Sequence, residues 1–226
     1  MMNFLSYLIN GISLGSVYAI IALGYTMVYG IAKMLNFAHG DIIMVGGFTA
    51  FTVVSTMGGS PIVGILAAVV VCTALGVAVE RIAYRPLRDA SPLAVLITAI
   101  GVSYLLQNLA LLIFGSNTKS FPEVIKLPNL KLAGGKLTIT GTTILTIVLC
   151  IVIMAGLMLF INKTKAGQAM LAVSEDKGAA QLMGINVNKT ISMTFAIGSA
   201  LAAIAGVLLC SAYPSLTPYT GSMPGI

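Results

Sequence analysis

The residues best suited to chemistry lie in one short polar segment, residues 35–41 (LNFAHGD). It carries Asn36, Asp41 and the only histidine of the chain, His39, between two long apolar runs. An ionisable side chain close to hydrocarbon usually faces protein or a water-filled cavity. We therefore predict a polar bend beside a translocation path. The alternative is an interfacial turn in which Asp41 caps the next helix, and a proton relay between His39 and Asp41 is a further hypothesis.

A second polar pair, Gln107 and Asn108, lies inside another apolar stretch. Two adjacent amides in a bilayer need hydrogen-bond partners. We predict that these amides lie near the outer end of a helix or face the translocation path. Hydrogen bonds to neighbouring helices are the alternative.

Nothing in the chain resembles an enzyme's active site. No acid–base or metal constellation is recognisable among His39, Asp41, Glu80 and Asp89. The cysteines are odd in number and lie in apolar surroundings, which indicates small core residues: Cys72, Cys150 and Cys210. The sequence also lacks a phosphate-binding G-x-x-x-x-G-K-[ST] loop. We expect a protein that is not an enzyme and that uses no cofactor or metal.

The composition places these residues in a membrane. Apolar residues make up 58% of the 226 and charged residues only 8%, against about 45–50% and about 25% in soluble domains. Charges are absent from residues 1–32, 42–79, 90–118, 137–162 and 190–226. Segments such as residues 62–79 are continuously apolar, as in membrane-spanning helices, and do not alternate as barrel strands do. The predicted fold class is all-α, a polytopic bundle with spans near 5–31, 42–57, 61–79, 92–114, 142–161 and 190–212.

The predicted spans distribute the basic residues unevenly. Loops 32–41, 80–91 and 162–189 carry eight of the 12 Lys and Arg residues, and the opposite side carries four. Because basic residues favour the cytoplasmic side, we place those loops inside and the N-terminus outside. If 42–57 is re-entrant, the N-terminus is inside. The outer loop 115–141 is expected to hold a short strand pair around Pro122, Pro128, Gly134 and Gly135. A net charge of +6 spread over such loops does not indicate nucleic-acid binding.

Small residues recur four apart at Gly11 and Gly15, and again at Gly198, Ala202 and Gly206. Such faces let helix backbones approach each other closely, either in a dimer or inside one bundle.

The loop 162–189 contains a candidate docking helix. Ser174 is a suitable N-cap, Glu175 and Asp176 suit a first turn, and Gly184 suits a left-handed stop. A helix from Ser174 to Met183 would present Ala179, Leu182 and Met183 on one face. So short a helix with an apolar knob is expected to dock into a partner's groove. Packing back onto its own bundle is the alternative.

Several motifs in order resemble one family, the permeases of branched-chain amino acid ABC importers. They are residues 10–19 (NGISLGSVYA), 23–30 (LGYTMVYG), 35–41 (LNFAHGD), 80–88 (ERIAYRPLR), and 174–176 (SED) with 182–186 (LMGIN). Ala179, Ala180 and Gly184 also have the spacing of the coupling-helix motif of ABC permeases. Gly178 departs from that motif, where glutamate is usual, and no Ile-x-Leu-Pro follows.

The resemblance implies a subunit of a bacterial cytoplasmic-membrane importer for leucine, isoleucine and valine. Its partners would be a second permease, two cytoplasmic ATP-binding subunits and a periplasmic or lipid-anchored substrate-binding protein. The ATPase-coupling residues would be Ser174, Glu175, Asp176, Ala179, Ala180, Leu182, Met183 and Gly184. The family continues beyond residue 226 into further helices, so we expect a chain truncated at its C-terminus. A urea or short-amide ABC permease, or a secondary transporter without an ATPase, remain the alternatives.

Overall fold

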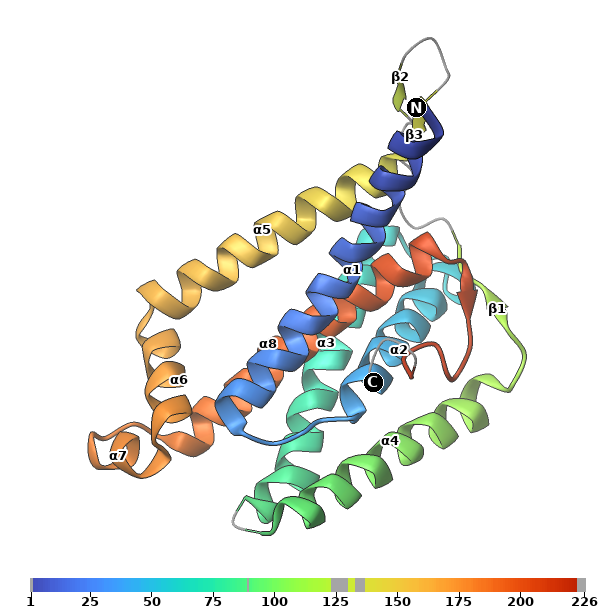
Figure 1. The fold of residues 1–226 in the computed structure, drawn as a ribbon. Coiled ribbons are helices and arrows are strands. Elements are labelled where there is room, and N and C mark those ends of the chain that lie inside the picture. The colour runs from blue at the N-terminus through green and yellow to red at the C-terminus, as the bar shows by residue number, and fades with distance from the viewer. Residues whose placement is uncertain (1, 89, 123–129, 133–136, 223–226) are drawn as a thin grey trace.

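The computed structural model describes residues 2–88, 90–122, 130–132 and 137–222 (Figure 1). Its long helices are α1 (Met2–Ala32), α2 (Ala38–Phe51), α3 (Pro61–Val79), α4 (Pro92–Phe114), α5 (Gly141–Lys163) and α8 (Val187–Ala212). Shorter ones are η1 (Thr52–Thr56), η2 (Glu80–Tyr84), η3 (Arg85–Leu87), α6 (Lys165–Glu175) and α7 (Lys177–Leu182). The strands are β1 (Lys119–Ser120), β2 (Leu130–Leu132), β3 (Leu137–Ile139) and β4 (Ser215–Leu216).

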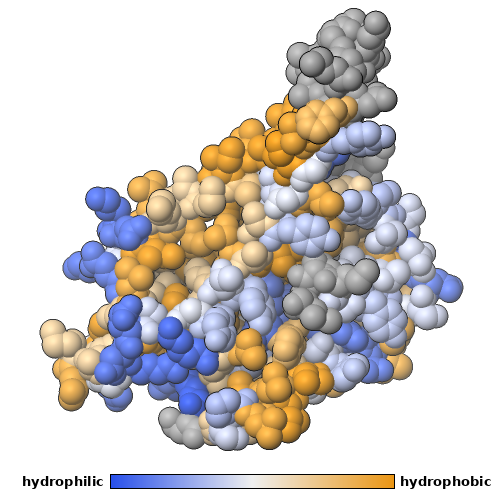
Figure 2. Space-filling model, in the orientation of Figure 1, coloured by the Kyte–Doolittle hydropathy of each residue, from blue (hydrophilic) through white to orange (hydrophobic). Residues whose placement is uncertain are grey.

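The all-α polytopic fold class is confirmed. Six helices of the described chain are long and apolar enough to cross a membrane. The third continues through η2 and η3 to Leu87, well beyond the predicted end, and the second begins four residues early, at Ala38. Figure 2 shows the apolar surface that these helices present across the middle of the molecule.

Helix α8 forms the centre of the bundle and packs against α1, α2 and α3. Buried residues make up 72% of its most apolar window, against 17% for α4 and 11% for α5, which flank the core. Small residues allow the close approach. A Cβ on Gly198 would lie 2.8 Å from Val28 Cγ2 and 3.1 Å from the Gly24 carbonyl oxygen. A Cβ on Gly11 or Gly15, by contrast, would meet no neighbouring group within 4 Å.

Helix α2 begins deep inside the bundle. Residues 33–37 are not helical and carry the chain from the end of α1 up to Ala38. His39 lies beside Gly24 of α1. Gly24 is about 12 Å along the axis of α1 from Ala32, where that helix ends. The Asp41 side chain is hydrogen-bonded to Gln107. Gln107 is about 22 Å along the axis of α4 from Pro92, where that helix begins. Since the hydrocarbon core is about 30 Å thick, α2 starts near mid-depth.

The two sets of connecting loops lie at opposite ends of the bundle (Figure 1). At one end β2 pairs with β3 and β1 with β4, both antiparallel. The β2–β3 pair confirms the strand pair expected in the outer loop, although Pro128, Gly134 and Gly135 lie outside the described residues. The turn at residues 57–60 is also at this end, where Gly58 has a positive φ of 66° and Ser60 caps α3. The other end carries α6 and α7.

Replacing Gly198 with leucine should destabilise the bundle by about 1–3 kcal/mol, because the new side chain meets the backbone of α1 and neither helix can move without repacking α8. The matched control is Gly15→Leu, on the open face of α1. The free energy of unfolding, measured by denaturant titration in mixed micelles, should fall for the first variant and stay within about 0.5 kcal/mol for the second. Equal losses at both positions would contradict the packing described.

Candidate functional site

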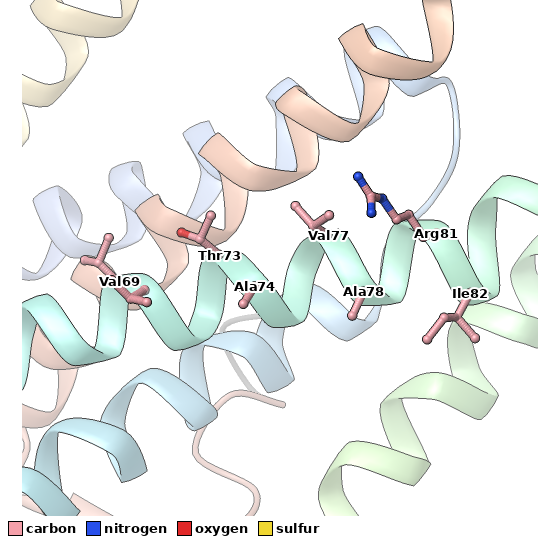
Figure 3. A pocket seen from close by; sticks show the side chains of 8 residues that line it. Val69, Thr73, Ala74, Val77, Ala78, Arg81 and Ile82 are labelled. Atoms are coloured by element: carbon pink, nitrogen blue, oxygen red, sulfur yellow. The ribbon is translucent and has the colours of Figure 1, made fainter.

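A groove with a volume of about 710 Å³ lies on the outer face of α3. All of its lining residues, from Val69 to Ile82, come from this one helix and its continuation (Figure 3). Only Thr73 and Arg81 among them are polar. A groove of this kind is the surface that a spanning helix presents to lipid or to a neighbouring helix, and it holds no converging polar groups.

A smaller cavity of about 390 Å³ lies at mid-depth, between the start of α2 and the middle of α4. Asp41, in the first turn of α2, accepts a hydrogen bond at its Oδ1 from Gln107 Nε2 at 3.0 Å. The same amide nitrogen donates to Ser103 Oγ at 3.2 Å. Three polar side chains from two helices therefore converge on one wall of the cavity.

The segment after β4 supplies another wall. Residues 217–222 form turns held by hydrogen bonds from Thr217 N to Thr220 Oγ1 at 2.7 Å and from Ser222 Oγ to Tyr219 O at 2.7 Å. Gly221 rests on the carbonyl of Gly40, where a side chain would collide with the backbone of α2. Non-helical backbone at membrane depth persists only where protein or a water-filled cavity surrounds it. The remaining lining residues are Phe37, Ile100, Tyr104, Tyr219 and Ser222.

The structure separates the predicted path residues. Asn36 is buried, and its Oδ1 accepts a hydrogen bond from Tyr84 at 3.0 Å, away from the cavity. His39 is buried beside Gly24 of α1, with its ring edge-on to Tyr25 at a centroid distance of 6.0 Å. Asn108 is exposed on the other face of α4. Only Asp41 and Gln107 meet at the cavity.

One expectation for these residues was wrong. Asp41 does not cap α2: the helix begins at Ala38, its N-cap is Phe37, and no side chain accepts a capping hydrogen bond there. Asn108 does not share a cavity with Gln107, because a helix turns about 100° per residue and so directs adjacent side chains apart. Its Nδ2 instead donates to the Tyr104 carbonyl of its own helix at 2.7 Å.

The predicted docking helix from Ser174 to Met183 is two helices. Ser174 lies in the last turn of α6 and donates to Leu171 O at 2.7 Å, so it is not an N-cap. Glu175 ends α6 instead of opening a first turn. The N-cap of α7 is Asp176, whose Oδ1 accepts from Gly178 N at 2.7 Å and Ala179 N at 3.0 Å. The extended backbone of Asp176 breaks the helix (φ −147°, ψ 114°).

Helix α7 ends as the sequence predicts. Gly184 has a positive φ of 83°. Its N–H donates to Gln181 O at 3.0 Å, and Ile185 N donates to Ala180 O at 3.0 Å, the two bonds of a Schellman motif. Ala180 faces inward, while Ala179, Leu182 and Met183 are exposed, Leu182 at 90% and Met183 at 83%. We define these three exposed residues as the α7 knob. Figure 1 shows α7 at the end of the molecule opposite β2 and β3.

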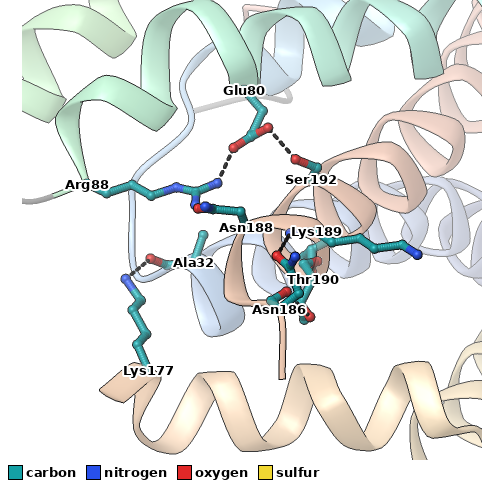
Figure 4. Close-up of polar contacts among 10 residues, drawn as sticks. Ala32, Glu80, Arg88, Lys177, Asn186, Asn188, Lys189, Thr190 and Ser192 are labelled. Atoms are coloured by element: carbon teal, nitrogen blue, oxygen red, sulfur yellow. Dashed lines mark hydrogen bonds and ion pairs between the residues drawn. The ribbon is translucent and has the colours of Figure 1, made fainter. Parts of the chain in front are cut away.

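A buried ion pair lies at the base of α3, and hydrogen bonds from its two members join it to the start of α8. Glu80, fully buried, pairs with Arg88, and its other oxygen accepts from Ser192 Oγ at 2.6 Å (Figure 4). Arg88 also donates to Asn188. Lys177 of α7 donates to the Ala32 carbonyl at the end of α1 at 2.9 Å. Within the described residues, no group of three His, Cys, Asp or Glu side chains could hold a metal ion.

Comparisons with known proteins identify the family of the chain. The family model described as "Branched-chain amino acid transport system / permease component" matches residues 7–225. The chain belongs to this permease family. The permease is therefore a multi-pass membrane protein of a transport system, as the motif resemblance implied.

Named relatives of the permease are similar over nearly its whole length. The high-affinity branched-chain amino acid transport system permease protein BraD of Pseudomonas aeruginosa is 42% identical, over 99% of this chain and 76% of BraD. LivH of Escherichia coli K12, of the same description, is 39% identical over the same shares. The probable branched-chain amino acid transport permease LivH of Methanocaldococcus jannaschii is 28% identical, over 90% of this chain and 65% of that protein. No solved structure matches.

Sequence reasoning missed several parts of the permease. The sequence did not mark Ser103 as a cavity residue, because the side chain of a serine in a spanning helix usually forms a hydrogen bond with the backbone of its own helix. Tyr219 and Ser222 lie far from Asp41 in sequence, and no local pattern could have placed them beside it. The Glu80–Arg88 ion pair could have been predicted, because Glu80 directly follows a long charge-free stretch and basic residues follow it closely.

Replacing Arg88 with alanine should cost the permease about 3–5 kcal/mol, because Glu80 would remain buried without its partner. Arg85→Ala is the matched control, since Arg85 is exposed in the same segment and its loss should cost less than about 0.5 kcal/mol. Adding Glu80→Gln to Arg88→Ala should recover part of the loss. Unfolding in mixed micelles measures all three, and equal effects of the two arginine variants would contradict a structural ion pair.

Proposed function

We propose that this permease is the membrane subunit of an ABC importer that moves leucine, isoleucine and valine across the cytoplasmic membrane of a bacterium. A second permease subunit, two cytoplasmic ATP-binding subunits and a periplasmic or lipid-anchored substrate-binding protein complete the transporter. The observation that carries the ATPase part of the proposal is the α7 knob, an apolar projection from a short helix held rigidly at both ends.

The substrate class rests on the family. The relatives in bacteria carry names that specify high-affinity transport of branched-chain amino acids, and their likeness spans 99% of this chain. The mid-depth cavity is compatible with such cargo, since Phe37, Ile100 and Tyr104 give it an apolar wall beside the polar group of Asp41 and Gln107. These two residues form our proposed translocation path, and Asn36 and His39 hold the bend that places them.

The proposed orientation follows from charge. The end of the bundle with α6 and α7 also carries Lys33 and Arg88, which line one cavity together with Lys177. Basic residues favour the cytoplasmic side. We infer that this end faces the cytoplasm, where an ATP-binding subunit could reach the α7 knob, and that the strand-bearing end meets the substrate-binding protein.

The α7 knob suits a docking role. Apolar side chains that are more than four-fifths exposed on a helix of six residues gain little from their own chain. A partner's groove would bury them, as in other helix-in-groove contacts. The cap at Asp176 and the stop at Gly184 fix the helix at both ends, so that a displacement of the knob moves α7 as a unit.

Contacts at the base of α7 could pass such a displacement into the membrane. Lys177 bonds to the last turn of α1, and Ile185 and Asn186 lead directly into α8. Arg88 bonds to Asn188 and so joins the start of α8 to the base of α3. We infer that closure of the ATP-binding subunits tilts these helices between two packings, which is alternating access.

The direct test is uptake by the reconstituted transporter. Proteoliposomes containing the full importer and its binding protein should accumulate labelled leucine only when ATP is supplied. A non-hydrolysable ATP analogue serves as the control. Uptake of labelled urea without leucine would favour the urea or short-amide alternative, and uptake driven by an ion gradient without ATP would overturn the ABC assignment.

Leu182→Asp should abolish co-purification of the ATP-binding subunit and reduce leucine uptake at least about tenfold, because a carboxylate cannot enter an apolar groove without a partner. Leu182→Met keeps the volume and should bind normally. Leu171→Asp places the same charge on α6, also at an exposed leucine, and tests whether charge alone disrupts the complex. Unchanged binding by Leu182→Asp would contradict the docking role.

A further inference from the structure

The mid-depth cavity contains a carboxylate oxygen without a partner. Asp41 is only 2% exposed, and while its Oδ1 accepts from Gln107, its Oδ2 has no hydrogen-bond partner in the described structure. A half-satisfied carboxylate in a membrane is costly, and such groups usually mark a binding site or an ion path. Asp41 is one of the residues that line the cavity, so its carboxylate lies next to the space that a ligand would occupy.

The cavity has a negative group and no positive one. Among its lining residues, Asp41 is the only acid, there is no Lys, Arg or His, and the remaining polar groups are the hydroxyls and the amide of Ser103, Tyr104, Gln107, Tyr219 and Ser222. The one histidine of the chain, His39, lies beside Gly24 of α1 and does not line the cavity. The Asp41 carboxylate is therefore suited to a cationic donor.

We propose that Asp41 binds the α-ammonium group of the transported amino acid in this cavity. The proposal rests on the function proposed above and adds a specific subsite to it. An ammonium group donates three hydrogen bonds, and Asp41 Oδ2 and the nearby hydroxyls provide acceptors. A charge-assisted bond of this kind is stronger than a neutral one.

The rest of the cavity fits the rest of such a molecule. Its volume of about 390 Å³ is at the lower end of the range of small-molecule pockets, about 300–1,000 Å³. Phe37 and Ile100 offer an apolar surface for a branched side chain, and Tyr219 offers a hydroxyl donor for the carboxylate. The first turn of α2 stabilises the negative charge of Asp41 through the helix dipole, so the group is prepared for a cation.

The test measures leucine binding to the complete transporter in lipid nanodiscs, without nucleotide or binding protein. Asp41→Asn should weaken binding of labelled leucine at least about tenfold, because a neutral amide loses the charge-assisted bond. Asp41→Glu, which keeps the charge, should retain more affinity than Asp41→Asn. The adjacent amides of α4 form a matched pair: Gln107→Ala should weaken binding severalfold, whereas Asn108→Ala, on the exposed face, should not.

A ligand without the amine separates recognition from a folding effect. 4-Methylpentanoate, which is leucine lacking its ammonium group, should bind weakly to the wild type and equally weakly to Asp41→Asn. Equal leucine affinity of the wild type and Asp41→Asn overturns the proposal, as does a parallel loss of both ligands in that variant. If the wild-type transporter fails to bind or import leucine at all, the proposed function itself fails and this subsite with it.

Discussion

Close backbone contact along α8 is the interaction on which the rest of the bundle depends. Lipid is as apolar as a leucine side chain, so helices in a membrane associate through packing and hydrogen bonds more than through the hydrophobic effect. Gly198 lets α8 reach the backbone of α1, and Gly206 lets it reach the backbone of α2 at Ile43. A third contact is made where Gly76 of α3 accommodates Ser199. Three helices are thereby held around one.

That packing allows α2 to be preceded by a non-helical segment, residues 33–37, inside the bundle. A helix that starts at mid-depth leaves its first N–H groups and the preceding chain without the water that would satisfy them. Here His39 N donates to the Asn36 carbonyl at 3.2 Å, Tyr84 at the base of α3 donates to the Asn36 side chain, and His39 fills the space that Gly24 leaves open. The polar bend is therefore a consequence of the core around it, and it brings Asp41 to the cavity.

The features that depend on local sequence patterns could be predicted from the sequence. Long charge-free stretches predicted the spans, and Gly184 predicted the end of α7, because each depends on a few neighbouring residues. Ser174 and Asp176 are equally good caps by residue type, and only the extended backbone at Asp176 decides between them. The cavity was beyond prediction, because it needs the return of residues 217–222 to the start of α2, a contact between segments remote in sequence.

The contacts connect the two proposed sites through the same helices. Lys177 joins α7 to α1, and the chain after α7 leads directly into α8. Further up, α1 and α8 meet at Gly24 and Gly198, and Gly24 also touches His39, two residues before Asp41. A tilt of α1 against α8 cannot leave His39 in place, since close-packed groups have no free volume to absorb it. Movement of the α7 knob would therefore change the cavity wall at Asp41, which would couple ATPase closure to the release of cargo.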